Sequence, residues 1–303
     1  MNRREIEDSV KACYSTWSDN YYDSYYGAGA PYPPVHRDLM IRLLREAKVK
    51  NVLDAGCGPA SFLRELMNEK LDLYGFDLTP EMVVEARRIF QEHHIPENHV
   101  WEGSVLSSAS FQPPSVKSKR FEAAVCVGVL PHIPQQADEE VIANLHGAVK
   151  KNGLVILEAR NQFFALFTLN RYSHQFLADE LLHVDELRKR AGSHLAQLDD
   201  ALEKMKSQFR MDMPPVRKGK ADEPGYDEVL SRTHNPLLLK QQFEAAGFDD
   251  IHLYFYHHHS LPPLYGAQVP ELFRAKSLEM EHQPEDWRGY FMASAFLVTG
   301  RRK

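Results

Sequence analysis

Residues 51–77 read NVLDAGCGPASFLRELMNEKLDLYGFD, and their pattern is the strongest indication of the fold. An apolar run leads into a glycine turn at Gly56 and Gly58, a helical pattern follows, and a second apolar run ends at Asp77. A strand, a tight turn, a helix and a second strand are typical of a βαβ unit with parallel strands. The stretch therefore predicts an α/β protein whose ligand site lies at the carboxyl end of its first strand.

The same rhythm extends on both sides of this unit. Residues 35–159 alternate short apolar runs with helical patterns, and the rhythm resumes at Asn235. There Asn235 and Pro236 supply an N-cap and a first-turn proline, and Gly247 stands where the helix would end. Strands that alternate with helices imply a parallel sheet covered on both faces. We predict a doubly wound, seven-stranded, mostly parallel sheet.

Two segments stand outside this core, which comprises residues 35–159 and 235–303. Residues 1–34 are rich in aromatic side chains and end in the turn-prone GAGAPYPP, which predicts an N-terminal helical arm. Residues 160–234 are polar and helical, and they predict an insertion that caps the substrate. Apolar residues at spacings of three and four over 195–209 predict one amphipathic helix, whose stripe is either internal packing or a homodimer contact.

Composition and charge exclude several classes of protein. The 303 residues are 43% hydrophobic, with a net charge of −6, which is typical of a globular protein and argues against a nucleic-acid partner. The three cysteines are scattered, so they predict a reducing compartment rather than a disulfide framework. The first residues lack the apolar region of a signal peptide, and no apolar run is long enough to cross a bilayer. We expect a cytoplasmic protein without a membrane partner.

The spacing between the glycine turn and Asp77 indicates a nucleoside ligand. Asp77 lies 21 residues beyond Gly56 and ends the second strand, where a carboxylate accepts hydrogen bonds from ribose hydroxyls. A dinucleotide fingerprint also requires a third glycine, and Ser61 occupies that position. A nicotinamide-dependent oxidoreductase is therefore disfavoured, although it stays an alternative.

Three motifs resemble those of the class I S-adenosylmethionine (SAM)-dependent methyltransferases of the small-molecule kind, types 11 and 12. Residues 54–58, DAGCG, resemble motif I of that family. Residues 121–134, FEAAVCVGVLPHIP, resemble its fourth-strand pattern FDxVxxxxVLxH, and residues 151–161, KNGLVILEARN, resemble its fifth-strand segment. The resemblance covers residues 35–160 and 235–303, and it implies a Rossmann-like methyltransferase fold with SAM as cofactor.

The resemblance also implies which residues hold SAM. The glycine turn would pass the amino-acid part of SAM, and Asp77 would hold the ribose. Ser104 stands where an aspartate is common in the family, which assigns the adenine contact to Ser104 and to backbone amides. The residues implied in SAM binding are Asp54, Gly56, Cys57, Gly58, Asp77, Leu78, Ser104, Val105, Val127, Gly128 and Tyr25.

His132 is the candidate catalytic residue. It follows the fourth strand, beside the position expected for the methyl group, and an imidazole with a pKa near 6.5 suits a general base for a hydroxyl acceptor. The competing interpretation is a structural histidine in the loop.

Substrate contacts are expected from the arm and from the late strands. Trp17 and Tyr21 stand at four-residue spacing, and aromatic faces attract a sulfonium or an ammonium group. Asn161 ends the fifth-strand pattern. Strand alternation would put His257 and His259 on one face, as a polar pocket wall rather than a metal site.

The predicted activity is methyl transfer to an oxygen or nitrogen atom of a small metabolite. The fourth strand lacks the N/D-P-P-Y/F motif of nucleic-acid and protein-amide methyltransferases. Cys126 lies inside an apolar run, which favours a buried hydrophobe over a nucleophile. A SAM-binding regulatory protein without turnover stays a second alternative.

Overall fold

The computed structural model describes residues 2–16, 21–27, 33–114, 116, 118–213 and 229–303. In chain order, its helices and strands are α1 (Arg3–Ser15), α2 (Tyr21–Tyr25), α3 (Val35–Glu46), β1 (Asn51–Ala55), α4 (Ser61–Leu66), β2 (Asp72–Asp77), α5 (Pro80–Glu92), β3 (Val100–Glu102), β4 (Phe121–Cys126), α6 (Asp138–Ala148), β5 (Val149–Arg160), α7 (Arg171–Gln175), α8 (Val184–Arg190), α9 (Leu195–Lys206), α10 (Pro236–Ala245), β6 (Phe248–His258), α11 (Pro263–Gly266), α12 (Pro270–Met280), α13 (Gly289–Met292) and β7 (Ala293–Arg302).

The strands form one seven-stranded sheet in the order β3-β2-β1-β4-β5-β7-β6. The strand β1 runs parallel to β2 on one side and to β4 on the other, so Leu53 pairs with both Tyr74 and Ala124. Only β7 is antiparallel to its neighbour β5 among the strand pairs with a defined register. The predicted doubly wound, mostly parallel sheet is confirmed.

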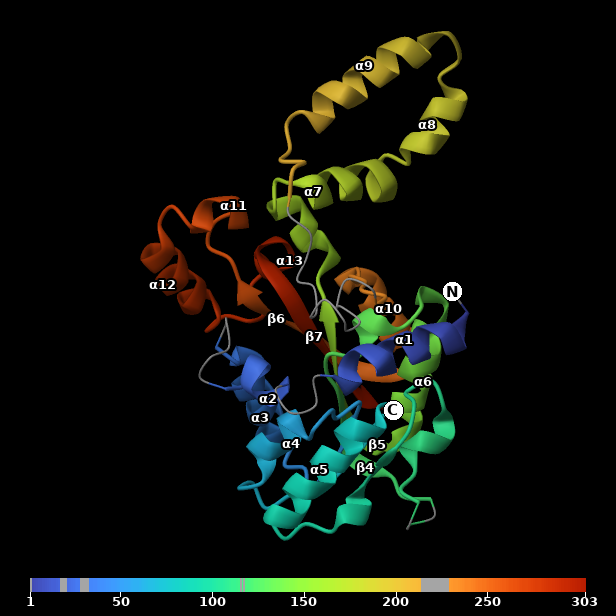
Figure 1. Cartoon of the computed structure of the whole chain (residues 1–303), viewed down its shortest axis with the longest axis vertical. Helices are drawn as coiled ribbons and strands as arrows, with labels where there is room; N and C mark the ends of the chain where they lie inside the picture. Colours follow the sequence, from blue (N-terminus) through green and yellow to red (C-terminus); the bar gives the residue numbers. More distant parts are fainter. Residues whose placement is uncertain (1, 17–20, 28–32, 115, 117, 214–228) are drawn as a thin grey trace. The chain divides into compact units, whose positions relative to one another are not determined.

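Helices cover both faces of the sheet. In Figure 1, α3, α4 and α5 lie on one side of the strands, and α6 and α10 lie on the other. The strand β1 is buried from Val52 to Ala55, as expected of a strand that is covered on both faces. No helix in the described ranges is both long enough and apolar enough to cross a membrane.

The predicted ends of α10 are confirmed. The side chain of Asn235 accepts hydrogen bonds from the N–H groups of Leu237 and Leu238, and Pro236 occupies the first turn. Gly247 follows the helix with a φ of +94°, a left-handed conformation that glycine adopts without strain. Local sequence therefore determines where this helix begins and ends.

The chain divides into two compact units, and each is described by itself. Unit 1 comprises residues 1–160, 217–254 and 295–303, and unit 2 comprises residues 161–216 and 255–294. Residues 255–294, which were expected in the core, group with residues 161–216 of the expected insertion.

The helices α8 and α9 of unit 2 contain no buried residue. The helix expected over 195–209 ends at Lys206, and Leu198, Leu202 and Met205 along its stripe are half-buried. An ion pair of 2.9 Å between Arg188 and Asp199 joins the two helices. The homodimer contact stays a prediction.

Candidate functional site

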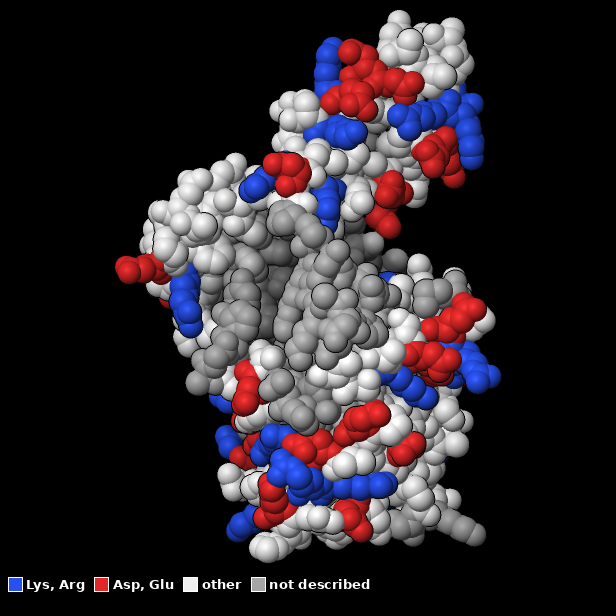
Figure 2. Space-filling model, in the orientation of Figure 1, with Lys and Arg blue, Asp and Glu red and all other residues white. Residues whose placement is uncertain are grey.

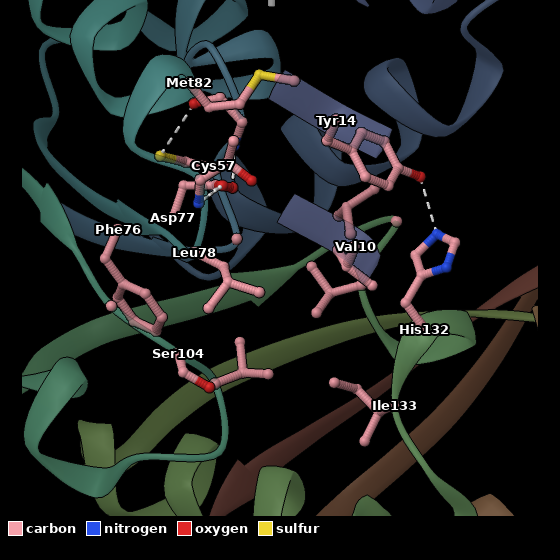
Figure 3. Close-up of a pocket in the computed structure, with 18 of the residues that line it drawn as sticks. Val10, Tyr14, Cys57, Phe76, Asp77, Leu78, Met82, Ser104, His132 and Ile133 are labelled. Carbon is pink, nitrogen blue, oxygen red and sulfur yellow. Dashed lines mark hydrogen bonds between the residues drawn. The ribbon is translucent and has the colours of Figure 1, made fainter. Parts of the chain in front are cut away.

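A pocket opens at the carboxyl ends of β1, β2 and β4, within unit 1. The strand order reverses between β1 and β4, and this switch point is where open α/β sheets bind ligands. Figure 3 shows side chains from the strand ends and from α1 converging on it. The predicted residues that line the pocket are Asp54, Gly56, Cys57, Gly58, Asp77, Leu78, Ser104, Val105, Val127, Gly128, His132 and Tyr21.

The glycine turn after β1 depends on two left-handed residues. Gly56 has a φ of +86° and Gly58 a φ of +53°. A Cβ atom on Gly56 would lie 2.3 Å from Cγ2 of Val129, so a side chain there is excluded by space as well as by backbone conformation. The N–H of Gly56 donates to the carbonyl of Phe76 over 2.8 Å, which ties the turn to β2.

Gly56→Ala is expected to lower the free energy of unfolding by about 1–3 kcal/mol, because alanine there is strained and overlaps Val129. Gly147→Ala is the matched control, since Gly147 lies in α6 with nothing within 4 Å of its added Cβ. In the control, the free energy of unfolding is expected to rise by about 0.5–1 kcal/mol, because alanine has a higher helix propensity than glycine. Urea unfolding measures both, and equal effects would contradict the assignment.

Asp77 fixes the glycine turn through both of its carboxylate oxygens. Its Oδ2 accepts a 2.8 Å hydrogen bond from the N–H of Gly58, and its Oδ1 accepts one of 2.8 Å from the N–H of Thr79. A carboxylate oxygen has two acceptor positions, so Asp77 can accept several hydrogen bonds at once. Burial raises the pKa of Asp77, whereas these backbone bonds lower it.

Asp54 is a buried carboxyl group at the end of β1. Burial raises its pKa to about 8, and the nearby charge of Asp77 adds to the effect. The group lines the pocket and is 2% exposed. A cationic ligand group would restore its ionised form, because an opposite charge favours a charged carboxylate.

Asp54→Asn is expected to make the ligand-free protein less sensitive to alkaline pH. A carboxyl whose pKa rises from 3.8 to about 8 on folding holds its proton more tightly in the folded state, so wild-type stability falls as pH rises between these values. Asparagine does not ionise, so the variant should gain on the order of a few kcal/mol at pH 8.5 and little near pH 4. Thermal unfolding at both pH values measures this. Asp72→Asn, at an exposed position on β2, is the control, and a wild-type pH profile in Asp54→Asn would refute the assignment.

The side of the pocket next to β3 is closed by α1. The hydroxyl of Ser104 donates to Oε1 of Glu7 over 2.5 Å and accepts from the N–H of Leu106 over 3.1 Å. Arg3 donates to the carbonyl of Leu106 and also pairs with Glu140. Glu7 was not among the predicted residues, because nothing in the sequence around it indicates that it reaches a ligand site.

A buried carboxylate at the end of β5 shapes the turn after β4. Oε2 of Glu158 accepts a 2.6 Å hydrogen bond from the N–H of Gly128, which has a φ of +73°. Glu158 is 7% exposed. The turn that leads to His132 is therefore held from the neighbouring strand.

Tyr14 and His132 meet across the pocket, as Figure 3 shows. The hydroxyl of Tyr14 lies 2.8 Å from Nε2 of His132, and Nδ1 of His132 lies 2.7 Å from the carbonyl oxygen of Leu230. A carbonyl only accepts, so Nδ1 carries the proton. Burial lowers the pKa of His132 to about 4, so the ring is neutral at pH 7 and Nε2 accepts the Tyr14 proton.

In the N-terminal arm, Tyr21 of α2 lies close to the two glycine turns. A Cβ on Gly58 would lie 4.0 Å from Cε1 of Tyr21, and one on Gly128 would lie 3.5 Å from its hydroxyl. The ring of Tyr25 lies 4.6 Å from that of Tyr21 at a tilt of 35°, but Tyr25 is 39% exposed, and Tyr26 lines the pocket instead. The predicted contact at Trp17 lies outside the described residues.

Asn161 does not present its amide to a ligand. Its Nδ2 donates to the carbonyls of Tyr290 and Ala293, both over 2.8 Å, and its Oδ1 accepts from the N–H of Phe163. The residue is 2% exposed and belongs to unit 2. Its side chain joins backbone segments of unit 2, and Asn161 is not among the residues that line the pocket.

His257 and His258 at the end of β6, and His259 directly after it, belong to unit 2, and their expected alternation is interrupted. His257 has a φ of +54°, so the two residues after it, His258 and His259, are both buried. The ring of His259 packs 4.8 Å from that of Phe164, and burial lowers its pKa to about 4. A local left-handed residue overrode the period of two on which the prediction rested.

Comparison with known proteins agrees with this geometry. A family model described as a methyltransferase domain matches residues 53–155. A SAM-dependent methyltransferase from Clostridium acetobutylicum ATCC 824 is 10% identical, over 94% of this chain and 97% of that one, with a TM-score of 0.55. Magnesium protoporphyrin IX methyltransferase from Synechocystis PCC 6803 with bound SAH is 14% identical, over 100% of both chains, with a TM-score of 0.53. No curated protein sequence matches this chain.

At such low identities the structural likeness shows the fold, and the family match covers the glycine turn and strands β1 to β5 up to residue 155. The seven-stranded sheet and the position of the pocket agree with both. Residues 53–155 therefore match a methyltransferase domain, and the chain has the Rossmann-like fold of the SAM-dependent methyltransferases to which it is similar.

Proposed function

We propose that this protein binds SAM in the pocket and transfers its methyl group to an oxygen or nitrogen atom of a small acceptor molecule by in-line displacement. The observation that carries the proposal is the hydrogen-bonded chain from Tyr14 through His132 to Leu230. It brings a neutral base into the same pocket as the glycine turn and Asp77.

The pocket offers suitable partners for the amino-acid part and the ribose of SAM. Asp54 would pair with the ammonium group, because its buried carboxyl lacks the charge that would keep it ionised. Asp77 would accept hydrogen bonds from the ribose hydroxyls. The hydroxyl of Ser61 is buried in the pocket wall without a hydrogen-bond partner among the described residues, and it would donate to the carboxylate of SAM.

The adenine would lie towards β3. Leu78 and Val105 line this part of the pocket and would cover the faces of the base. The carboxylate of Glu7, held by Ser104, is an acceptor for the adenine amino group. This arrangement assigns to Glu7 the contact that an aspartate at position 104 makes in many relatives.

The chain contributes proton transfer, alignment and exclusion of water. When bound, SAM supplies a methyl group on a positively charged sulfur. The oxygen of Tyr14 accepts a hydrogen bond from an acceptor hydroxyl while its own proton points at Nε2 of His132. During methyl transfer to the acceptor oxygen, the acceptor proton would pass to Tyr14 and the Tyr14 proton would pass to His132. The imidazole would then carry the positive charge, with its Nδ1–H still bonded to Leu230.

This proton path favours a hydroxyl acceptor. A neutral amine attacks without prior loss of a proton, whereas a hydroxyl of high pKa gains about 10²- to 10⁴-fold from a general base. The apolar side chains of Ile6, Val10 and Ile133 line the same part of the pocket and would exclude water.

Charge supports a small acceptor rather than a nucleic acid. The net charge is −6, and on the face in Figure 2 the basic and acidic side chains alternate rather than gather into a basic patch. On α5, for example, Arg88 pairs with both Glu85 and Glu92. A phosphate backbone would meet carboxylates there as often as cations.

Calorimetry with SAM, S-adenosylhomocysteine and NAD⁺ tests the cofactor, and mass spectrometry of small molecules released from the purified protein provides an independent readout. Binding of SAM and its demethylated product, without NAD⁺ binding, is expected. Binding of NAD⁺ alone would favour the oxidoreductase. Tight SAM binding without methyl transfer to any hydroxyl or amine in an acceptor library would favour the regulatory protein.

A further inference from the structure

Arg232 ties the chain that returns after the insertion to the loop after β4. Its backbone N–H donates to the carbonyl of Pro131 over 2.9 Å, and its Nε donates to the carbonyl of Ile133 over 2.6 Å. Pro131 and Ile133 are the chain neighbours of His132, so Arg232 holds this loop on both sides of the imidazole. Each of these two hydrogen bonds joins residues about a hundred positions apart in the sequence, so the local sequence pattern does not predict them.

The guanidinium of Arg232 is anchored by a carboxylate at the start of α6. Its Nη2 pairs with Oδ1 of Asp138, and the two side chains are 18% and 6% exposed. The same Nη2 lies 3.0 Å from Nε2 of His234, and the N–H of His234 donates to the carbonyl of Arg160 over 2.7 Å. Charge-assisted hydrogen bonds of this kind are stronger than neutral ones, and removing one partner leaves the other charge buried.

We propose that Arg232 is a positioning residue for His132, because it sets the register of the segment 229–235 and thereby holds the Leu230 carbonyl against Nδ1. Leu230 lies two residues before Arg232, and its carbonyl oxygen is 2.7 Å from Nδ1. An extended chain advances about 3.3 Å per residue, so a slip of one residue takes this carbonyl out of hydrogen-bond range.

The carbonyl selects the tautomer of His132. While Leu230 accepts from Nδ1, the proton stays there and Nε2 accepts from Tyr14. Without that carbonyl the proton can occupy Nε2 instead, and the ring then donates towards Tyr14 and no longer accepts its proton. The catalytic meaning of this inference rests on the proposed function, whereas the tautomer itself does not.

Other ionisable groups that face His132 are not themselves altered by a substitution of Arg232. Among the described residues these are Tyr14 on α1 and Arg160 at the end of β5, whose charge acts on both Tyr14 and His132. Arg160 also donates to the hydroxyl of Ser231, so it contacts the same segment from the other side. A change of tautomer in an Arg232 variant therefore reports on the register of the segment.

Nitrogen NMR of histidine-labelled, ligand-free protein tests the proposal. In the wild type, the His132 ring is expected as a single neutral species protonated at Nδ1 from pH 5.5 to pH 8. Arg232→Lys keeps a positive charge but cannot reach both Ile133 and Asp138, so a mixture of the two neutral tautomers is expected. Arg45→Lys is the matched control, because Arg45 makes two bonds to Glu69 at an exposed position. The control should keep the wild-type spectrum.

A wild-type His132 signal in Arg232→Lys would overturn the proposal. If that variant does not fold, Asp138→Asn takes its place, because it removes the carboxylate charge that anchors the guanidinium while leaving Arg232 itself unchanged. A smaller but measurable population of the second tautomer is expected there, and an unchanged spectrum overturns the proposal. Failure of the wild type to bind SAM in calorimetry would refute the proposed function without altering this result.

Discussion

Turnover is expected to fall by about 10²- to 10⁴-fold when His132 is replaced by alanine, while affinity for SAM is retained. The substitution removes the group that receives the Tyr14 proton but leaves the glycine turn and Asp77 in place. Release of S-adenosylhomocysteine with a hydroxyl acceptor measures turnover, and calorimetry measures SAM binding. In the wild type, turnover should fall only as the pH approaches about 4. Burial lowers the pKa of His132 to that value, and the protonated ring no longer acts as a base.

Two further variants separate proton transfer from packing at this position. Tyr14→Phe keeps the ring and removes the hydroxyl, so it should lower turnover in the same direction without altering SAM affinity. His99→Ala is the control, because His99 also lies against a backbone carbonyl, that of Leu73 at 3.1 Å, but sits at the amino ends of the strands. Normal turnover in His132→Ala, or an equal loss in His99→Ala, would contradict the assignment of a general base.

Asp77→Ala is expected to weaken SAM binding about 10- to 150-fold. A hydrogen bond to a charged group contributes about 1.5–3 kcal/mol, and about 1.4 kcal/mol corresponds to a factor of ten in affinity. The loss has two sources, since Asp77 both offers acceptors to the ribose and holds the N–H groups of Gly58 and Thr79. Calorimetric titration with SAM and with S-adenosylhomocysteine measures it, and both ligands should lose affinity equally because both carry the ribose.

Asp72→Ala is the matched control at the other end of β2, where the side chain is half exposed and pairs with Lys119. It should bind SAM like the wild type. An unchanged dissociation constant in Asp77→Ala would refute the ribose assignment. A loss of affinity for SAM without a loss for S-adenosylhomocysteine would indicate that Asp77 acts on the sulfonium rather than on the ribose.

Local patterns predicted the parts of the site that lie within one βαβ unit. Asp54, the two glycines and Asp77 belong to one strand-turn-helix-strand stretch, and the parallel pairing of β1 with β2 brings their ends together. The ends of α10 followed from Asn235, Pro236 and Gly247 for the same reason. In each case the residues that determine the conformation lie within a few positions of one another or on adjacent strands.

Such patterns do not predict contacts between residues that lie far apart in the sequence. Tyr14 and Leu230 are 118 and 98 residues from His132, and the sequence around neither one indicates an approach to the imidazole. Glu7 reached Ser104 in the same way, across 97 residues. At His257 even a short-range expectation was wrong, because a left-handed residue interrupted the strand period.

The sheet, the glycine turn and the acid at the end of β2 therefore follow from the amino-acid sequence, because hydrophobic period and turn chemistry are local properties of the chain. The protonation of the site depends on how the chain packs in three dimensions. Burial lowers the pKa of His132 and raises that of Asp54, and the Leu230 carbonyl, held by Arg232, selects which imidazole nitrogen bears the proton. Burial and hydrogen-bond geometry arise only when distant segments pack together, and they set the chemistry that the residues at this site can perform.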